Sequence, residues 1–400
     1  MSEWISTILS DVVELVIDYR GKTPKKLGSD WCDDGYRALS AKNIKTGQIV
    51  QEDTIRYVDE ELYHKWMKEE IKRGDILITS EAPFGQIYYW DSDEKIVLSQ
   101  RLFAIRIKKE FDARYIYQYM ATQLFYEEMS ARATGTTVIG LRQPELMKCK
   151  IKYPDIETQK KISAILCAID RKRNNNVLIN NNLYQQLDTI YCATYPYLPS
   201  DELPAGWNCV PLGTLCDSIS IRHSFDKEKL IFLNTGDVEN GHFLHTTYSL
   251  VKDMPGQAKK SIKTNDILYS EIRPVNRHFA FVNFQADDYV VSTKLMVIRS
   301  RGMDSRRLYH FLTTQDVINE LQIEAESRSG TFPQIRFENI QRLPIIIAPS
   351  DIELQFTQIL KDYYNMIDNN ICENQHLVTL HDSILPKLIS GELDVSELDI

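Results

Sequence analysis

Residues 155–191 read "DIETQKKISAILCAIDRKRNNNVLINNNLYQQLDTIY", and this stretch decides how the chain is organised. Its heptad positions are Ile162, Ile169, Asn176, Leu183 and Ile190, and the adjoining stripe holds Ile165, Leu166, Ile179 and Leu187. A narrow stripe with this period predicts one long helix that packs along a single partner helix.

A second stretch, residues 351–393, has the same pattern. Its heptad positions are Phe356, Tyr363, Asn370, Leu377 and Ile384, flanked by Ile359, Leu360, Met366, Ile367 and Leu388. Both stretches place one asparagine at the middle position, so an antiparallel pair would bring Asn176 close to Asn370 and fix the register. The alternative is two ordinary amphipathic helices, each packed on its own domain. A stripe this narrow favours the coiled coil.

Composition places the chain among globular proteins. Its 400 residues are 43% hydrophobic and 26% charged, which suits two or three domains. The opening "MSEWISTILSDVVELV" lacks a basic segment followed by an apolar run, and no stretch approaches the roughly 18 apolar residues of a spanning helix. We therefore expect a cytoplasmic protein with no membrane contact.

Cysteine spacing and charge restrict the possible chemistry. The seven cysteines are scattered without a CxxC pair, which argues against a disulfide framework and a zinc knuckle. A net charge of −9 argues against a nucleic-acid-binding surface that is basic throughout, and leaves local basic faces possible.

The chain repeats itself after about 190 residues. "IKRGDILITSEAP" (71–83) returns as "IKTNDILYSEIRP" (262–274), "VLSQRLFAIR" (97–106) as "VVSTKLMVIR" (290–299), and "TGTTVIGLR" (134–142) as "SGTFPQIR" (329–336). The first copy predicts strands over 75–79, 86–90 and 97–107 and one helix over 113–133. Such a long period indicates a duplicated unit of one domain and one helix.

The predicted fold class is therefore α+β, with two tandem mixed α/β domains separated by two long helices that form an antiparallel coiled coil. We expect the first domain over residues 1–152, the first helix over 153–196, the second domain over 197–347, the second helix over 348–391 and a tail over 392–400. The divergent loops between matched strands suit two domains that read different targets, because loops commonly carry recognition.

This layout resembles the specificity subunit of type I restriction-modification systems. The most specific motifs are "LPKLISGELDV" (385–395), "ELPAGW" (202–207) and "DIETQKKISAIL" (155–166), together with the repeated elements inside the domains. The central helix lacks the "PKLISGEL" ending and runs into "CATYPYLP" (192–199), so the two copies differ there.

The resemblance implies a DNA-reading subunit in which each target-recognition domain reads one half of a bipartite double-stranded DNA target. It also implies that the helices set the spacing and dock two adenine-methylating modification subunits, with motor-nuclease restriction subunits in the full complex. From Ile162 to Ile190 is about 42 Å of helix, and successive major-groove faces recur about every 34 Å.

The sequence predicts no catalysis and no cofactor. It lacks a GxxxxGK[ST] phosphate loop, an Asp- or Asn-Pro-Pro-aromatic tetrapeptide and an HExxH metal pattern. The acidic residues Asp91, Asp93 and Glu94 are better explained as a solvated turn than as a nuclease site. The main alternative function is a coiled-coil scaffold whose two heads bind protein, which the acidic net charge favours.

Candidate DNA-binding residues are polar side chains in the turns after matched strands, since arginine and lysine suit guanine or phosphate and the amides suit adenine. In the first domain they are Lys42, Asn43, Ser80, Gln86, Arg101, Thr136, Thr137 and Arg142. In the second they are Asn234, Asp237, Arg273, Asn276, Arg277, Lys294, Arg328, Thr331 and Gln334.

Overall fold

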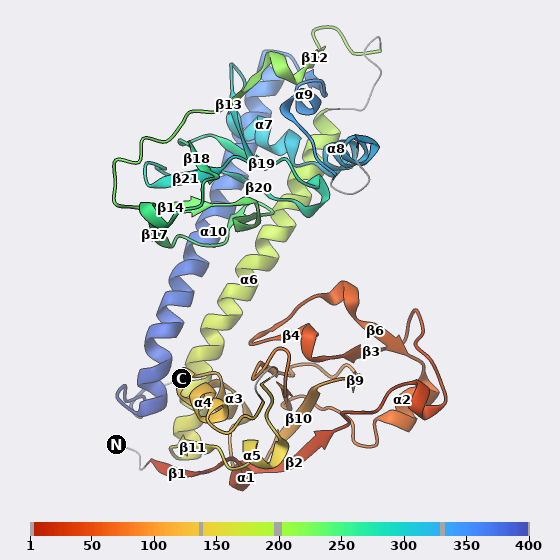
Figure 1. The fold of residues 1–400 in the computed structure, drawn as a ribbon, viewed down its shortest axis with the longest axis vertical. Helices are drawn as coiled ribbons and strands as arrows, with labels where there is room; N and C mark the ends of the chain where they lie inside the picture. Colours follow the sequence, from red (N-terminus) through yellow and green to blue (C-terminus); the bar gives the residue numbers. More distant parts are fainter. Residues whose placement is uncertain (1–3, 136–138, 196–201, 329–332, 399–400) are drawn as a thin grey trace. The chain divides into compact units, whose positions relative to one another are not determined.

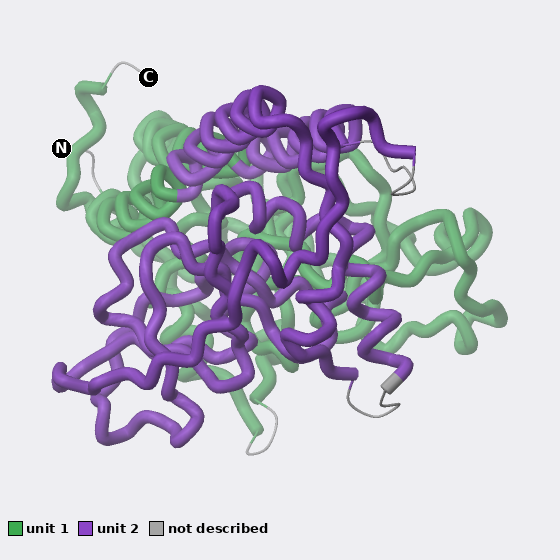
Figure 2. Tube along the Cα trace, turned by 90° about the horizontal axis from the view of Figure 1, so that it is seen from above, with its two compact units in different colours: residues 1–176, 372–400 green, residues 177–371 purple. Residues whose placement is uncertain are grey.

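The computed structural model describes residues 4–135, 139–195, 202–328 and 333–398. The chain divides into two compact units (Figure 2), unit 1 with residues 1–176 and 372–400 and unit 2 with residues 177–371. The division falls within the two long helices, α6 (Ile156–Thr194) and α10 (Ser350–Ser390). Each unit therefore holds one mixed domain and a part of both helices.

Figure 1 labels most elements of unit 1. They are β1 (Ile5–Ile8), α1 (Leu9–Val12), β2 (Val13–Asp18), β3 (Tyr36–Leu39), β4 (Ile44–Lys45), β5 (Gln48–Ile49), β6 (Arg56–Val58), α2 (Glu60–Trp66), β7 (Ile76–Thr79), β8 (Ile87–Tyr89), β9 (Ile96–Leu98), β10 (Leu102–Ile107), α3 (Ala113–Met120), α4 (Gln123–Ser130), α5 (Gln143–Leu146) and β11 (Lys150–Tyr153).

Unit 2 repeats the order of the strands with one addition, β18, and has no α-helix at the places of α1 and α2. Its elements are β12 (Asn208–Pro211), β13 (Cys216–Ile219), β14 (Lys229–Leu233), β15 (Val238–Glu239), β16 (His242–Phe243), β17 (Tyr248–Leu250), β18 (Ala258–Ser261), β19 (Ile267–Ser270), β20 (Phe279–Phe281), β21 (Tyr289–Ser292), β22 (Leu295–Ser300), α7 (Ser305–Leu312), α8 (Gln315–Arg328), α9 (Phe337–Ile340) and β23 (Pro344–Ile347).

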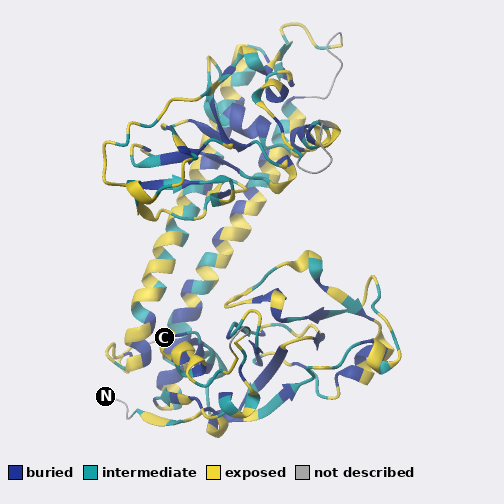
Figure 3. Ribbon diagram, viewed as in Figure 1, coloured by how far each residue is buried: buried dark blue, intermediate teal, exposed yellow. Residues whose placement is uncertain are grey.

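The sheets show that the sequence repeat is a structural duplication. Unit 1 has a four-stranded sheet of order β2-β10-β7-β8, and unit 2 has the matching order β13-β22-β19-β20. A second sheet, β6-β3-β9 in unit 1 and β17-β14-β21-β18 in unit 2, contains one parallel pair in each case, β3 with β9 and β14 with β21. The strand cores are largely buried (Figure 3).

Two predicted elements of the first domain are interrupted. The strand predicted over 97–107 is two strands, because the chain passes between the two sheets at Arg101, whose φ is +60°. The helix predicted over 113–133 is α3 followed by α4. Thr122 begins the second helix by accepting a hydrogen bond from the Phe125 backbone N–H at 3.2 Å, and N-terminal capping by threonine is a common way to start a helix.

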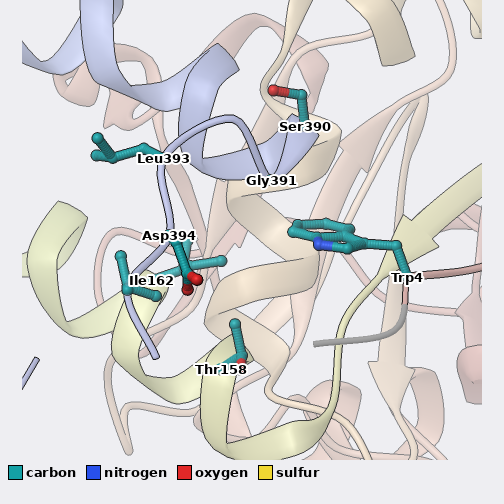
Figure 4. Close-up of a pocket in the computed structure, with 8 residues that line it drawn as sticks. Trp4, Thr158, Ile162, Ser390, Gly391, Leu393 and Asp394 are labelled. Carbon is teal, nitrogen blue, oxygen red and sulfur yellow. The ribbon is translucent and has the colours of Figure 1, made fainter. Parts of the chain in front are cut away.

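The end of α10 completes the core of unit 1. Leu385, Leu388, Ile389 and Val395 pack into the cluster that also holds Leu9 and Leu166. Figure 4 shows the indole of Trp4 beside Gly391, beyond the end of α10. A Cβ on Gly391 would lie 2.5 Å from Trp4 Nε1, so only glycine fits against this ring.

The seam of the helix pair follows most of the predicted stripe. On α6, Ile162, Leu166, Ile169, Leu183 and Leu187 are buried as expected. Ile179 and Met366 are exposed, in contrast to the prediction, and Asn180 and Ile367 are buried beside them. On α6 the row with the seven-residue period, from Ile162 to Leu183, stays buried. The second row of the seam is Leu166, Asn180 and Leu187, so Ile179 lies one position outside it.

Candidate nucleic-acid interface

The four-stranded sheet of each unit, β2-β10-β7-β8 in unit 1 and β13-β22-β19-β20 in unit 2, is called the inner sheet below. The same buried ion pair stabilises this sheet in both units. In unit 1, Arg106 Nε and Nη2 each donate to the carboxylate of Asp75 at 2.9 Å. In unit 2, Arg299 binds Asp266 in the same two-pronged way, at 2.7 and 2.9 Å. Both aspartates also accept a backbone N–H three residues earlier in the chain. Each buried carboxylate is therefore paired with a cation and hydrogen-bonded, which compensates its charge. The same pair lies at the equivalent place of the sheet in both units.

At the ends of the two central strands of this sheet, β7 and β10, unit 1 places a glutamate beside an arginine. Arg101 Nε lies 3.0 Å from Glu81 Oε1, and 51% of the Arg101 side chain is exposed. Ser80 N–H donates to the Arg101 carbonyl at 2.9 Å, and Leu141 N–H donates to the Ser80 carbonyl at 3.0 Å. These bonds hold Arg101 at the surface between two turns.

Unit 2 also places a carboxylate beside a cation here. Lys294 Nζ lies 3.2 Å from Glu271 Oε2, and Gln334 accepts from the same ammonium at 3.5 Å. Glu271 N–H donates to the Lys294 carbonyl at 3.1 Å, and Ile335 N–H donates to the Glu271 carbonyl at 2.8 Å. A cation with an adjacent carboxylate therefore recurs at the ends of these strands in both units. The two glutamates were not among the predicted residues, and they occupy neighbouring positions of the repeat: Glu271 stands where unit 1 has Ser80, one residue before the position of Glu81.

Several predicted residues of the first domain are structural. Asn43 is buried, and its amide donates to the Gln51 carbonyl and Thr54 Oγ1, both at 3.2 Å, while its Oδ1 accepts from Ser40. Ser80 is buried as well. Asn43 thus supports its loop and has no polar atom left for a base.

The other described residues of this set lie at the surface. Lys42 and Arg142 are exposed, and Arg142 precedes helix α5 as its N-cap. Gln86 is half-buried, and its Oε1 accepts from the Thr46 backbone N–H at 3.0 Å. Thr136 and Thr137 lie outside the described residues.

In the second domain, Arg273, Asn276, Lys294 and Gln334 are exposed. Arg273 has a φ of +43° and precedes Pro274, as Ala82 with a φ of +42° precedes Pro83 in unit 1. At this position of the repeat the second domain therefore has an exposed arginine side chain where the first domain has only a methyl group.

The remaining residues of this set are partly used within the domain. Asn234 N–H donates to Asp237 Oδ2 at 2.7 Å, so the two cap each other. Arg277 Nη1 donates to Asn240 Oδ1 at 3.5 Å, and its other terminal nitrogen binds Gln315. The side chain of Arg328 and all of Thr331 lie outside the described residues.

The asparagines of the helix seam pair differently from the prediction. Within unit 1, Asn176 donates to Glu373 Oε2 at 2.7 Å and to Asn374 Oδ1 at 2.9 Å. Within unit 2, Asn370 donates to Asn180 Oδ1 at 2.7 Å. The expected approach of Asn176 to Asn370 is therefore wrong by one helical turn, since each meets an asparagine four residues beyond the other.

The polar layer also includes charge. Lys172 Nζ lies 3.0 Å from Glu373 Oε2. The hydrogen bond from Asn176 and that from Lys172 hold the pKa of Glu373 below its ordinary value. The antiparallel orientation is therefore marked in both units by polar pairs, as expected of a coiled coil with a specified register.

Within the described part of the chain, no group of three or more histidine, cysteine, aspartate or glutamate residues could hold a metal ion. Among the same residues, no helix is long and apolar enough to cross a membrane.

Comparison with known proteins identifies the family. The family model "Type I restriction modification DNA specificity domain" matches residues 1–187 and again residues 204–377. The HindI specificity subunit of Haemophilus influenzae is 42% identical over 174 residues, which are 43% of this chain and 38% of that protein. The MjaIX specificity subunit of Methanocaldococcus jannaschii is 24% identical over 345 residues, 82% of this chain and 79% of that protein.

The fold has a counterpart among solved structures. The S subunit of a type I restriction-modification system from M. genitalium aligns with a TM-score of 0.59 and 13% identity, covering 97% of this chain and 96% of that one. The two family matches coincide with the duplicated architecture described above. The chain belongs to the type I restriction-modification DNA specificity family and carries two copies of its domain.

Proposed function

We propose that this chain is the DNA sequence-specificity subunit of a type I restriction-modification complex. Each domain reads one half of a bipartite double-stranded DNA target. The observation that carries the proposal is the repetition of one scaffold, with the same buried Asp–Arg pairs, beneath exposed side chains that differ between the copies. A fixed scaffold with variable surface residues suits the recognition of two different sequences.

The exposed cations at the strand ends can bind the groups that DNA presents. Arg101 pairs with Glu81 through Nε at 3.0 Å, and half of its side chain remains exposed. A guanidinium with this geometry can bind the O6 and N7 acceptors of guanine or a phosphate. Lys294, Arg142 and Arg273 offer further donors, while the net charge of −9 keeps the attraction local.

We infer that the helices set the half-site spacing and dock two modification subunits, which are adenine methyltransferases. On α6, Val177, Leu178 and Ile179 are 50%, 65% and 45% exposed. Asn176 and Asn180 face α10, so Leu178 lies on the opposite side of the helix and the other two lie on its flanks. Exposed large apolar side chains on a helix indicate a surface that a partner covers.

Domain exchange tests the proposed function. Residues 2–152 are replaced by the matching domain of a relative, the hybrid is expressed with its modification subunits, and the methylated motif is sequenced. We expect one half-site to change while the other half-site and the spacer stay the same. Exchange of residues 197–347 should give the reciprocal result, and a change in both halves from either exchange would contradict the modular reading of DNA.

The chain has no catalytic role in this proposal. Methylation belongs to the modification subunits, and cleavage belongs to motor-nuclease restriction subunits in the full complex. Incubation of the pure chain with S-adenosylmethionine, ATP, magnesium and duplex DNA should give no methylation and no cutting. Turnover that co-purifies with this chain would contradict a recognition subunit.

The acidic net charge favours a second candidate, a coiled-coil scaffold with two protein-binding heads. The two functions differ in how binding depends on salt. Retention on duplex DNA in the presence of the methyltransferase should weaken steeply as salt rises, because phosphate contacts release counterions. Retention that is absent at every salt concentration would favour the scaffold.

A further inference from the structure

Each unit contains one short hairpin of two-residue strands, and the two hairpins have the same backbone arrangement, which is called the frame below. In unit 1, β4 pairs with β5 in the register Ile44 with Ile49 and Lys45 with Gln48. In unit 2, β15 pairs with β16 in the register Val238 with Phe243 and Glu239 with His242. Ile44 and Val238 are fully buried, so both hairpins are anchored by their first residue.

Both hairpins bind the same strand of the inner sheet. The Gly47 backbone N–H donates to the Ile87 carbonyl of β8 at 3.2 Å, and the Gly241 N–H donates to the Phe279 carbonyl of β20 at 2.9 Å. β8 and β20 occupy equivalent edge positions in their sheets. The hairpins therefore extend from the same place in the two copies.

A tyrosine hydroxyl lies beside each hairpin glycine. A Cβ on Gly47 would lie 3.6 Å from Tyr117 Oη, and a Cβ on Gly241 would lie 2.9 Å from Tyr309 Oη. The two tyrosines are the fifth residues of α3 and α7. Both glycines have positive φ, +79° and +87°, which glycine adopts without strain. The backbone of each tip is thus fixed by its own domain.

Side-chain bonds immobilise the tips further. Gln86 Oε1 accepts from the Thr46 N–H at 3.0 Å and from its hydroxyl at 3.2 Å. At the position equivalent to Gln86, His278 Nδ1 lies 2.8 Å from the Val238 carbonyl. A rigid support of this kind lowers the entropy lost when the hairpin binds a partner.

The exposed pair across each hairpin differs completely between the copies. Unit 1 presents Lys45 opposite Gln48, and unit 2 presents Glu239 opposite His242; all four are exposed. Within the described part of the chain, Lys45, Gln48 and Glu239 have no hydrogen bond or ion pair from their side chains. The frame is shared while the presented chemistry changes from a cation and an amide to a carboxylate and an imidazole.

We propose that these two hairpins are specificity-determining elements, one for each half-site, and that their exposed cross-strand pairs contact base edges. This inference rests on the proposed DNA-reading function. The major groove admits a two-stranded β-ribbon, lysine donates to guanine, and glutamine forms paired hydrogen bonds with adenine. Glu239 would be repelled by phosphate and can accept from the amino group of cytosine, so it discriminates between bases instead of adding general affinity.

The experiment exchanges the pairs between matched frames. One variant combines Lys45→Glu with Gln48→His, and the reciprocal variant combines Glu239→Lys with His242→Gln. Thr46, Asn240 and both glycines are kept, so the turns and their supporting bonds are unchanged. Lys25→Glu, at an exposed position away from the hairpin in the same domain, is the control for net charge. All variants are assayed with modification subunits, by motif sequencing and by binding to randomised duplexes.

The first variant should change base preference in one half-site by about tenfold or more at one or more positions, which is the usual effect of a lost base contact. The other half-site and the spacer should stay as in the unaltered chain. The reciprocal variant should change the opposite half-site. Lys25→Glu should leave both preferences unchanged.

Two results would overturn the hairpin assignment. One is an unchanged base preference in both variants. The other is uniform weakening across sequences that matches Lys25→Glu, which would indicate phosphate attraction only. If the pairs cannot be exchanged without unfolding, Lys45→Ala with Gln48→Ala is measured in the same assay, and preserved preference there also refutes the assignment. An unaltered chain without any bipartite preference would refute the proposed function instead.

Discussion

Asn370 donates a hydrogen bond from its side-chain amide to Oδ1 of Asn180, at 2.7 Å, within the helix seam of unit 2. The Asn180 amide in turn donates to the Ile367 carbonyl at 3.3 Å. Asn180→Leu removes the acceptor for Asn370 and should destabilise unit 2 by roughly 1–3 kcal/mol, because a partly buried amide loses its partner. Chemical unfolding followed by circular dichroism measures this change.

The double variant, Asn180→Leu with Asn370→Leu, should be more stable than the sum of the two single changes predicts, because no amide is stranded. We expect a coupling energy of about 0.5–3 kcal/mol. Asn181→Leu, at an exposed position of the same helix, controls for helix propensity. Loss of the polar pair should also increase self-association, measured by light scattering. Additive single changes would show that the two asparagines act independently.

The buried and exposed ion pairs of unit 1 should differ sharply in their contribution to stability. Arg106→Met leaves the buried carboxylate of Asp75 without its cation and should cost about 3–5 kcal/mol. Arg73→Met removes a cation that binds Asp91 and Asp93 at the surface, where solvent screens the attraction, so the free energy of unfolding should change little. Denaturant midpoints for the two variants test this, and equal costs would contradict the burial argument.

Stability should fall as the solution becomes acidic, because His310 is buried without charge. Burial, together with the nearby Arg307 cation, lowers the pKa of His310 from 6.5 to about 3. Nε2 lies 3.8 Å from Asp188 Oδ1, too far for a hydrogen bond. The unfolded chain binds the proton at about pH 6.5 and the folded chain does not, so the stabilisation is complete above that pH and is lost between about pH 6.5 and pH 3.

The expected loss from this residue is about 2 kcal/mol between pH 7 and pH 5, at 1.36 kcal/mol for each unit of pH. His310→Gln is the matched variant, since Gln118 stands at the equivalent position of α3. Unfolding free energies at several pH values should show a shallower acid decline in this variant. The same decline in both proteins would mean that His310 does not cause it.

The spacer between half-sites should follow the length of the helices. One heptad is inserted after Leu178 in α6 and another after Cys372 in α10, opposite each other in the observed register. Each insertion adds about 10.5 Å of helix, equivalent to about three base pairs. Motif sequencing should show a spacer longer by about that amount. Insertion of a heptad in α6 alone is the control, and it should disrupt pairing instead of lengthening the spacer.

The helix seam shows what one sequence can and cannot predict. Ile162, Leu166, Leu183 and Leu187 were found from periodicity alone, because burial of apolar residues repeats along one helix. The pairing of Asn180 with Asn370 depends on the register between two helices 190 residues apart, and no pattern within either helix contains it. The expected partner of Asn176 was therefore wrong by one turn.

The candidate interface was predictable in its scaffold and less so in its surface. The repeated strands predict that Arg101 and Lys294 lie at equivalent strand ends. Asn43 was wrongly predicted to be a surface group, because its bonds to Gln51 and Thr54 cannot be read from the sequence. The hairpins escaped detection because strands of two residues have no periodicity. Their shared frame depends on bonds to β8 and β20, which are distant in the sequence.

The packing of Trp4 against Gly391 affects the order in which the two domains fold during synthesis on the ribosome. The core of unit 1 needs Leu388, Ile389 and Val395, which are translated about 235 residues after the first domain. At synthesis rates of about 5–20 residues per second, the nascent first domain waits roughly 10–50 s for these side chains. The apolar surface at Leu9 and Ile162 stays uncovered during that interval, so the first domain completes its core only after the second domain has been translated.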